Sequence, residues 1–253
     1  MKQRKYDNLN VVIEQTAEEM GKTAALAIAE EIKRLSKEKD TIRMMFAAAP
    51  SQNTTLTALK EIEGLPWEKI EAFHMDEYVG IKDDKPQSFR NYLKRWIFDL
   101  KPFKAVNLIK GDAEDAKKEC KEYGELLTSS PLDIIVLGIG ENGHIAFNDP
   151  PNALFNDPQP TRIIKLSERS RIQQVNDGCF SKIDDVPYMA ITVTIPVFSS
   201  ASSLFCVVPN NRKADAVKKA LEEPISEMCP ASILRQHSKA TLFLDAESAS
   251  KLN

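Results

Sequence analysis

The sequence predicts an α/β fold in which helices cover both faces of a mainly parallel β-sheet. Short apolar runs rich in β-branched residues alternate with longer segments of helical periodicity through most of the 253 residues. Polar clusters follow several of the apolar runs, as expected where ligands bind outside the carboxyl ends of parallel strands. No internal repeat, low-complexity segment or linker divides the chain. We therefore expect one domain over residues 1–253.

The first half of the chain predicts three helix and strand pairs after an opening helix. Apolar positions at helical spacing indicate one long helix over residues 10–35. Strands are expected over residues 41–49, 70–74 and 105–109, and helices over 54–62, 87–98 and from an Asp112 cap to about Leu127.

The second half continues the alternation. Strands are expected over residues 132–137, 162–166, 188–195, 203–208 and 240–244. Helices are expected after a Ser167 cap, from residues 210–213 to Leu221, from Pro230 to about His237, and after an Asp245 cap.

A glycine turn at residues 138–149 is the central feature of the sequence. It follows a buried strand and reads Gly-Ile-Gly-Glu-Asn-Gly-His-Ile-Ala-Phe-Asn-Asp. The glycine spacing matches the dinucleotide fingerprint, but Pro150 and Pro151 would stop the helix which that motif requires. A plain turn with a surface histidine is the simpler alternative. We favour a catalytic loop that presents Glu141, Asn142, His144 and Asp149.

Carboxylates and one histidine suggest proton transfer. Asp76 and Glu77 directly follow a buried strand, where they are either solvated loop charges or a general base. His144 is the natural partner, because histidine is the side-chain type that exchanges protons near neutral pH without perturbation, and Asp149 could fix its tautomer. With no metal cluster and no nucleophilic serine or cysteine motif, this set suits proton transfer on a polyol or sugar.

Two polar turns could hold an anion. Ser51 and Gln52 open one predicted helix, and residues 210–213, which end in Lys213, open another. Helix amino termini offer free N–H groups and a positive dipole end, and Lys213 adds a full charge. Ordinary helix capping explains either turn equally well.

Composition excludes several classes of function. The net charge of -3 argues against broad binding to nucleic acid, and no apolar run reaches the roughly 20 residues of a membrane span. The amino terminus lacks the apolar segment of a signal peptide. Four widely spaced cysteines suggest reduced thiols in a cytoplasm, and three histidines without a cluster make a metal site unexpected.

Two strings resemble one known family. Residues 73–80 read Phe-His-Met-Asp-Glu-Tyr-Val-Gly and residues 143–148 read Gly-His-Ile-Ala-Phe-Asn. Together they are similar to the glucosamine-6-phosphate isomerase/deaminase family. The resemblance implies a modified Rossmann-like, three-layer fold and no cofactor. It also implies conversion of a 2-amino-2-deoxyhexose 6-phosphate to a ketohexose 6-phosphate and ammonia. The small sugar phosphate would be the partner, and a homo-oligomer is compatible with the sequence.

The resemblance also implies roles for individual residues. Asp76 would move a proton between C2 and C1 of the sugar, and His144, oriented by Asp149, would open the pyranose ring. Lys213 would bind phosphate. The substrate would also lie against the following residues: Ser51, Gln52, Glu77, Gly140, Gly143 and Arg171.

The sequence departs from the family pattern at three places. Asn142 replaces an aspartate, so Glu141 could be a second partner of His144. Pro50 stands in the phosphate turn and has no N–H to donate. An arginine expected near residues 176–178 is absent, with Arg171 the nearest. A 6-phosphogluconolactonase and a catalytically impaired sugar-phosphate-binding protein are therefore alternatives, and the gluco or galacto substrate stays open.

Overall fold

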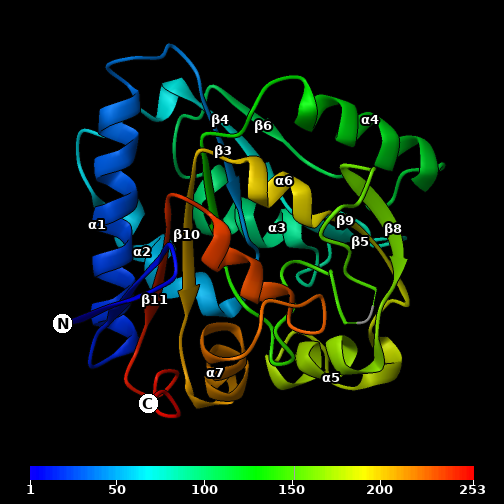
Figure 1. Ribbon diagram of the computed structural model, residues 1–253. Helices are drawn as coiled ribbons and strands as arrows, with labels where there is room; N and C mark the ends of the chain where they lie inside the picture. The colour runs from blue at the N-terminus through cyan, green and yellow to red at the C-terminus, as the bar shows by residue number, and fades with distance from the viewer. Residues whose placement is uncertain (151) are drawn as a thin grey trace.

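Eight strands form the central sheet in the computed structural model, which describes residues 1–150 and 152–253 (Figure 1). Their order is β1-β2-β11-β10-β7-β3-β4-β6, and every pairing except β1 with β2 is parallel. The strands are β1 (Lys2–Tyr6), β2 (Leu9–Ile13), β3 (Ile42–Phe46), β4 (Ile70–His74), β6 (Ala105–Asn107), β7 (Ile134–Leu137), β10 (Ser203–Val208) and β11 (Ala240–Leu244). The predicted fold class is confirmed. Pro151 lies outside the described residues.

Helices pack on both faces of the central sheet. Along β7, Ile134 and Val136 join the core beneath α1, α2 and α3, whereas Ile135 and Leu137 join the core beneath α4, α6 and α7. This alternation makes the three layers. The helices are α1 (Ala17–Leu35), α2 (Asn53–Glu61), α3 (Phe89–Leu93), α4 (Ala116–Thr128), α5 (Glu168–Asn176), α6 (Ile195–Ser200) and α7 (Ala214–Glu222). A wider π-type turn at Lys94–Phe98 continues α3.

A second, antiparallel sheet of three strands lies beside the first (Figure 1). It contains β5 (Asp76–Tyr78), β8 (Thr161–Lys165) and β9 (Met189–Val193), with β9 in the middle. The sequence predicted β8 and β9 but gave no sign of their antiparallel pairing. It also placed Asp76 in a loop, whereas β5 pairs Asp76 with Thr192.

The predicted helix over residues 10–35 is wrong in its first part. Leu9–Ile13 is β2, which pairs with β11, and the helix begins only at Ala17. The Thr16 side chain caps α1 by accepting the N–H of Glu19 at 3.1 Å. One of its two partner strands, β11, lies more than 200 residues away, so local periodicity could not reveal it; the other, β1, was not predicted.

The predicted Asp112 cap is also wrong. Asp115 caps α4 by accepting the N–H groups of Lys117 and Lys118 at 2.9 and 3.0 Å. Asp112 instead pairs with the Arg90 guanidinium at 2.7 Å. Both aspartates precede α4, but only Asp112 pairs with Arg90, and Asp115 is the residue that caps the helix.

The carboxyl-terminal predictions hold in part. Pro230–Gln236 is a 3-10 helix, and β11 has the predicted bounds. Asp245 accepts the N–H of Ser248 at 2.7 Å, but the residues after it form turns in place of the expected helix.

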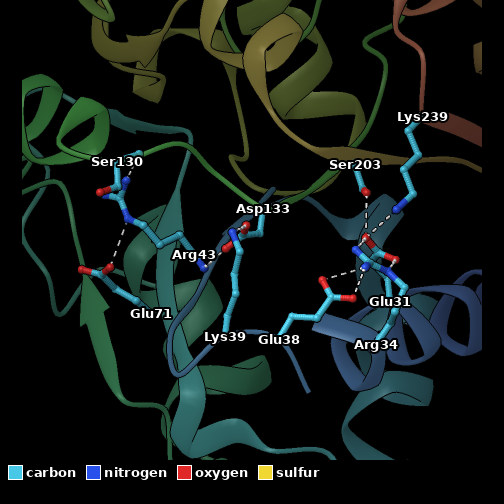
Figure 2. A network of polar contacts seen from close by, with 10 residues as sticks. All are labelled: Glu31, Arg34, Glu38, Lys39, Arg43, Glu71, Ser130, Asp133, Ser203 and Lys239. Atoms are coloured by element: carbon cyan, nitrogen blue, oxygen red, sulfur yellow. Dashed lines mark hydrogen bonds and ion pairs between the residues drawn. The ribbon is translucent and has the colours of Figure 1, made fainter. Parts of the chain in front are cut away.

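A network of charged residues joins the amino ends of the strands (Figure 2). We call it the amino-edge network; it consists of Glu31, Arg34, Glu38, Lys39, Arg43, Glu71, Ser130, Asp133, Ser203 and Lys239. Buried Asp133 accepts the Arg43 N–H at 2.9 Å, and the Arg43 guanidinium lies 3.1 Å from Glu71. Glu31 accepts Lys239 Nζ at 2.7 Å and Ser203 Oγ at 3.0 Å.

The charge on Glu31 is expected to stabilise the fold. The hydrogen bond from Arg34 leads the causes that lower its pKa from 4.5 to about 2; burial opposes this, and Lys239 adds to it. A lowered pKa gives stability that is complete above the unfolded value and lost as pH falls toward 2. Glu31→Gln should therefore lower the free energy of unfolding at pH 7 by about 1–3 kcal/mol. The difference in free energy of unfolding between wild type and Glu31→Gln should become smaller as pH falls from 4.5 to 2.

Urea unfolding at several pH values checks this expectation. Glu38→Gln is the matched control, because Glu38 pairs with the same Arg34 but its side chain is 59% exposed. Its cost should stay below about 1 kcal/mol. Equal costs for the two variants would contradict the role given to Glu31.

Candidate functional site

A cavity lies at the carboxyl ends of β10, β7, β3 and β4, four neighbouring strands of the central sheet. The chain extends from β3 to β4 and β6 on one side, then returns to place β7 on the other side of β3. The cavity therefore opens at a topological switch point, where ligands bind in open α/β sheets. Its lining residues are Ala47, Ala48, Ala49, Ser51, Gln52, Met75, Asp76, Phe89, Gly138, Ile139, Gly140, His144, Ala146, Phe147, Gln173, Gln174 and Lys213.

Asp76 faces this cavity from β5 and is only 7% exposed. Burial, and then the neighbouring Glu77 carboxylate, raise the pKa of Asp76 well above its usual range. A carboxyl group with a raised pKa is a stronger base when ionised. This placement suits a general base.

Glu77 points away from the cavity and is fully buried. Its carboxylate accepts the N–H groups of Tyr78, Phe89 and Arg90 at 3.0–3.1 Å and the Ser88 hydroxyl at 2.7 Å. These bonds tie β5 to the start of α3. The expected contact between Glu77 and substrate is not supported by this geometry, in which Glu77 holds Asp76's strand in place.

His144 is held through Nδ1 by an amide and a carboxylate. Nδ1 lies 2.6 Å from Asn142 Oδ1 and 3.1 Å from Asp149 Oδ1. Asn142 Nδ2 donates to Asp149 Oδ1 at 2.8 Å, which fixes the amide with its oxygen toward the imidazole. Two acceptors around Nδ1 place the proton of the neutral ring on that atom. Nε2 is then the free acceptor.

Asp149 stays ionised beside His144. Burial opposes its charge, but hydrogen bonds from His144, Asn142 and Ser170 lower its pKa to about 2. The Ser170 hydroxyl lies 2.7 and 2.8 Å from the two Asp149 oxygens and 3.4 Å from His144 Nδ1. No sequence signal marks Ser170, because a serine in an amphipathic helix is typical of an exposed face.

Glu141 does not hold His144, contrary to the expectation that it could. Its backbone N–H donates to Gln173 Oε1 at 2.9 Å, and its buried Oε1 has no hydrogen-bond partner among residues 1–150 and 152–253. Burial lowers the pKa of Lys213, and the Glu141 carboxylate lies near enough to that residue to oppose this effect.

Two glycines of the turn are required by close packing. A Cβ at Gly140 would lie 2.1 Å from His144 Cε1, so the imidazole rests against bare backbone. Gly143 has a φ of +86°, and a Cβ there would lie 2.7 Å from Cys229 Sγ. Gly140 therefore shapes the cavity, whereas Gly143 shapes the turn behind it and does not line the cavity.

Strand β9 anchors the loop that carries His144. Thr192 Oγ1 accepts the Phe147 N–H at 3.1 Å, and Asn148 Nδ2 donates to the Val193 carbonyl at 2.8 Å. Immediately before these two residues, Ala146 adopts a left-handed φ of +50°, which is uncommon for a residue with a side chain. The loop is thus held in a constrained conformation at the cavity wall.

A further group of lining residues, which we call the anion end, consists of Ser51, Gln52, Gly138 and Lys213. Gln52 Nε2 donates to Val207 O at 3.3 Å, which brings the turn after β3 against β10. Lys213 is 4% exposed, and no carboxylate of the described chain lies within 4.0 Å of its ammonium group. Burial lowers the Lys213 pKa, against opposing effects of Asp177 and Glu141.

The Arg171 side chain contacts residues outside the cavity. Its guanidinium donates to the carbonyls of Ile183 and Val186 at 2.6 and 3.2 Å and lies 3.9 Å from the centre of the Tyr188 ring. It does not line the cavity, so this placement gives no support to the expected phosphate contact.

Two glutamines of α5 line the cavity in its place, and the sequence did not single them out. Gln173 and Gln174 stand three and four residues after Ser170, on the same helix face. That spacing is the only signal that could have found them. One face of α5 therefore both supports Asp149 and forms a cavity wall.

Neither a metal cluster nor a membrane helix is found within the described ranges. No group of three His, Cys, Asp or Glu side chains there could hold a metal ion. No helix there is both long and apolar enough to cross a membrane.

Comparisons with known proteins agree on one family. A family model described as glucosamine-6-phosphate isomerases/6-phosphogluconolactonase matches residues 15–243. Glucosamine-6-phosphate deaminases of Bacillus thuringiensis (strain Al Hakam) and Bacillus cereus (strain B4264) are each 35% identical over 242 residues, which is 96% of this chain and 88% of each relative.

Solved structures share the fold. A monomeric glucosamine-6-phosphate deaminase superimposes with a TM-score of 0.87 at 34% identity, covering 95% of this chain and 98% of that one. A 6-phosphogluconolactonase from Trypanosoma brucei has a TM-score of 0.80 at 17% identity over the full length of both chains, which shows the fold alone. The resemblance found in residues 73–80 and 143–148 is thus confirmed, and the chain belongs to the family of glucosamine-6-phosphate isomerases and 6-phosphogluconolactonases.

Proposed function

We propose that the protein is an amino-sugar-6-phosphate isomerase/deaminase that converts glucosamine 6-phosphate and water to a ketohexose 6-phosphate and ammonia. One observation carries this proposal: a single cavity combines a buried carboxylate, a histidine with a free Nε2, and a buried lysine. The 35% identity to glucosamine-6-phosphate deaminases supports the gluco configuration. Four free cysteines support a cytoplasmic location.

His144 would open the pyranose ring. With the Nδ1 proton directed to Asn142 and Asp149, Nε2 can accept the proton of the anomeric hydroxyl and return one to the ring oxygen. The imidazolium formed between these steps is stabilised by ionised Asp149. The product of this step is the open-chain aldehyde.

Asp76 would then isomerise the open chain. Its carboxylate takes the proton from C2 and delivers it to C1 on the same face of a cis-enolamine intermediate, while O1 gains a proton and the amino group loses one. The resulting C2 imine reacts with water, which supplies the keto oxygen as ammonia leaves. Lys213 would hold the phosphate at the anion end.

Ammonia release from purified protein tests the proposed function. The panel is glucosamine 6-phosphate, galactosamine 6-phosphate and 6-phosphogluconolactone, with ketohexose phosphate and lactone hydrolysis measured in parallel. We expect ammonia and ketohexose phosphate in equal amounts from the gluco substrate. Lactone hydrolysis without ammonia, or sugar-phosphate binding without turnover, would overturn the proposal.

Asp76→Asn should remove most activity and also stabilise the protein. An amide cannot accept the C2 proton, so kcat should fall at least about a hundredfold. Because the pKa of Asp76 is raised in the folded state, its ionisation at neutral pH reduces stability, and stability falls as pH rises through that pKa.

Thermal unfolding at pH 5 and pH 8 measures the second effect. In a domain of this size each 1 kcal/mol gained raises Tm by about 2–4 °C. The Tm of Asp76→Asn should exceed the Tm of wild type by more at pH 8 than at pH 5. A destabilised variant, or wild-type turnover, would contradict the assigned role.

Ser170→Ala should impair ring opening through Asp149. Loss of the hydroxyl removes a charge-assisted hydrogen bond, so kcat on the closed pyranose should fall about tenfold, with a smaller change on an open-chain analogue. Ser167→Ala is the matched control, because it removes the helix cap of α5 but no contact with Asp149. Equal losses on both substrates would show that Ser170 does not act through His144.

A further inference from the structure

The anion end is poor in positive charge for a site that holds a phosphate dianion. Lys213 is the only lysine or arginine among the lining residues of the described chain. Pro50 removes one backbone donor from the turn after β3. Two carboxylates, Asp177 and Glu141, already act on Lys213. A second negative charge on the ligand would therefore be weakly compensated.

Gln52 leaves a hydrogen-bond acceptor without a donor. The residue is fully buried and lines the cavity. Nε2 lies 3.3 Å from Val207 O and 3.2 Å from Ser51 Oγ, so this atom is the donor and the amide orientation is fixed. Oε1 is buried with no partner among the described residues. An unpaired acceptor of this kind is costly unless a ligand donates to it.

We propose, building on the proposed function, that the anion end binds the 6-phosphate as its monoanion. Lys213 pairs with an ionised oxygen, and the remaining P–OH donates to Gln52 Oε1. The phosphate dianion has acceptors only, so one of its oxygens would face Gln52 Oε1 with no hydrogen bond between them. Gln52 is then the residue that determines which ionisation state of the substrate binds.

This assignment makes binding depend on pH. The second pKa of a phosphate monoester is about 6, so the monoanion fraction falls about tenfold for each pH unit above that value. Apparent affinity falls by the same factor, because only the competent fraction binds. The titratable groups that line the cavity are Asp76, His144 and Lys213, and the charged groups Asp177, Glu141 and Arg212 act on Lys213.

Two analogues separate the ligand's ionisation from that of the enzyme. Glucitol 6-phosphate and glucitol 6-sulfate are both open-chain and without an amine. The sulfate ester stays a monoanion without an O–H throughout, so it cannot donate to Gln52 Oε1 and should bind more weakly than the phosphate at pH 5.5, but its own charge does not change with pH. Calorimetry on the full-length protein from pH 5.5 to 8.5 gives the ratio of their Kd values, in which enzyme titrations cancel. We expect the phosphate-to-sulfate ratio to rise about tenfold per pH unit above about 6. Phosphate binding at pH 8 should take up nearly one proton more than sulfate binding.

Two variants test the part played by Gln52. Gln52→Met keeps the side-chain length but removes the acceptor, so the ratio should become nearly independent of pH. Gln174→Met is the matched control: it alters another amide of the cavity wall and should keep the wild-type slope.

A flat or falling ratio in wild type would overturn the inference, as would an unchanged slope in Gln52→Met or a lost slope in Gln174→Met. Ammonia release from glucosamine 6-phosphate together with a flat ratio would contradict this inference alone. Failure of both analogues to bind at any pH would contradict the sugar-phosphate substrate as well.

Discussion

The site depends on one strand of the small sheet, β9. Its Thr192 pairs with the backbone of Asp76, and the same residue's hydroxyl accepts the N–H of Phe147 in the loop that carries His144. The two groups proposed to move protons come from strand ends separated by more than 60 residues. Their relative position is therefore set by a strand that supplies no chemistry itself. Asn148 adds a second link from the loop to β9, through Val193.

One charged side chain and one neutral amide hold the imidazole of His144. An aspartate and an asparagine surround Nδ1, and Asn142 both accepts from the ring and donates to the carboxylate. Ser170 supplies a further donor to the same carboxylate. Asp149 thus stays ionised although it is buried, while the cavity wall gains only one negative charge at this position.

The sequence predicted the architecture and singled out Asp76 and His144, which line the same cavity, because both predictions follow from local signals. The strands at residues 70–74, 203–208 and 240–244 agree with the structure at both ends, and the strings around Asp76 and His144 identified the family. What failed depends on distant partners. β2 was taken for helix because its neighbour β11 lies at the other end of the chain, and Glu77 gave no sign that it would receive four hydrogen bonds. Ser170, Gln173 and Gln174 belong to a helix whose buried face became evident only once its neighbours were placed.

The amino-edge network (Figure 2) lies at the amino ends of the strands, whereas the cavity lies at their carboxyl ends. Within residues 1–150 and 152–253, Asp133 and Arg43, which join the strand starts, form no hydrogen bond or ion pair with the residues that line the site. This separation bears on how such a chain can diverge. Substitutions in the turn after β3 or on the inner face of α5 can retune ligand preference while the sheet's anchoring stays intact. The proline at position 50 and the loss of the arginine near residues 176–178 could thus accumulate under selection for a different ionisation state of the ligand. No variant along that route would have to lose its fold.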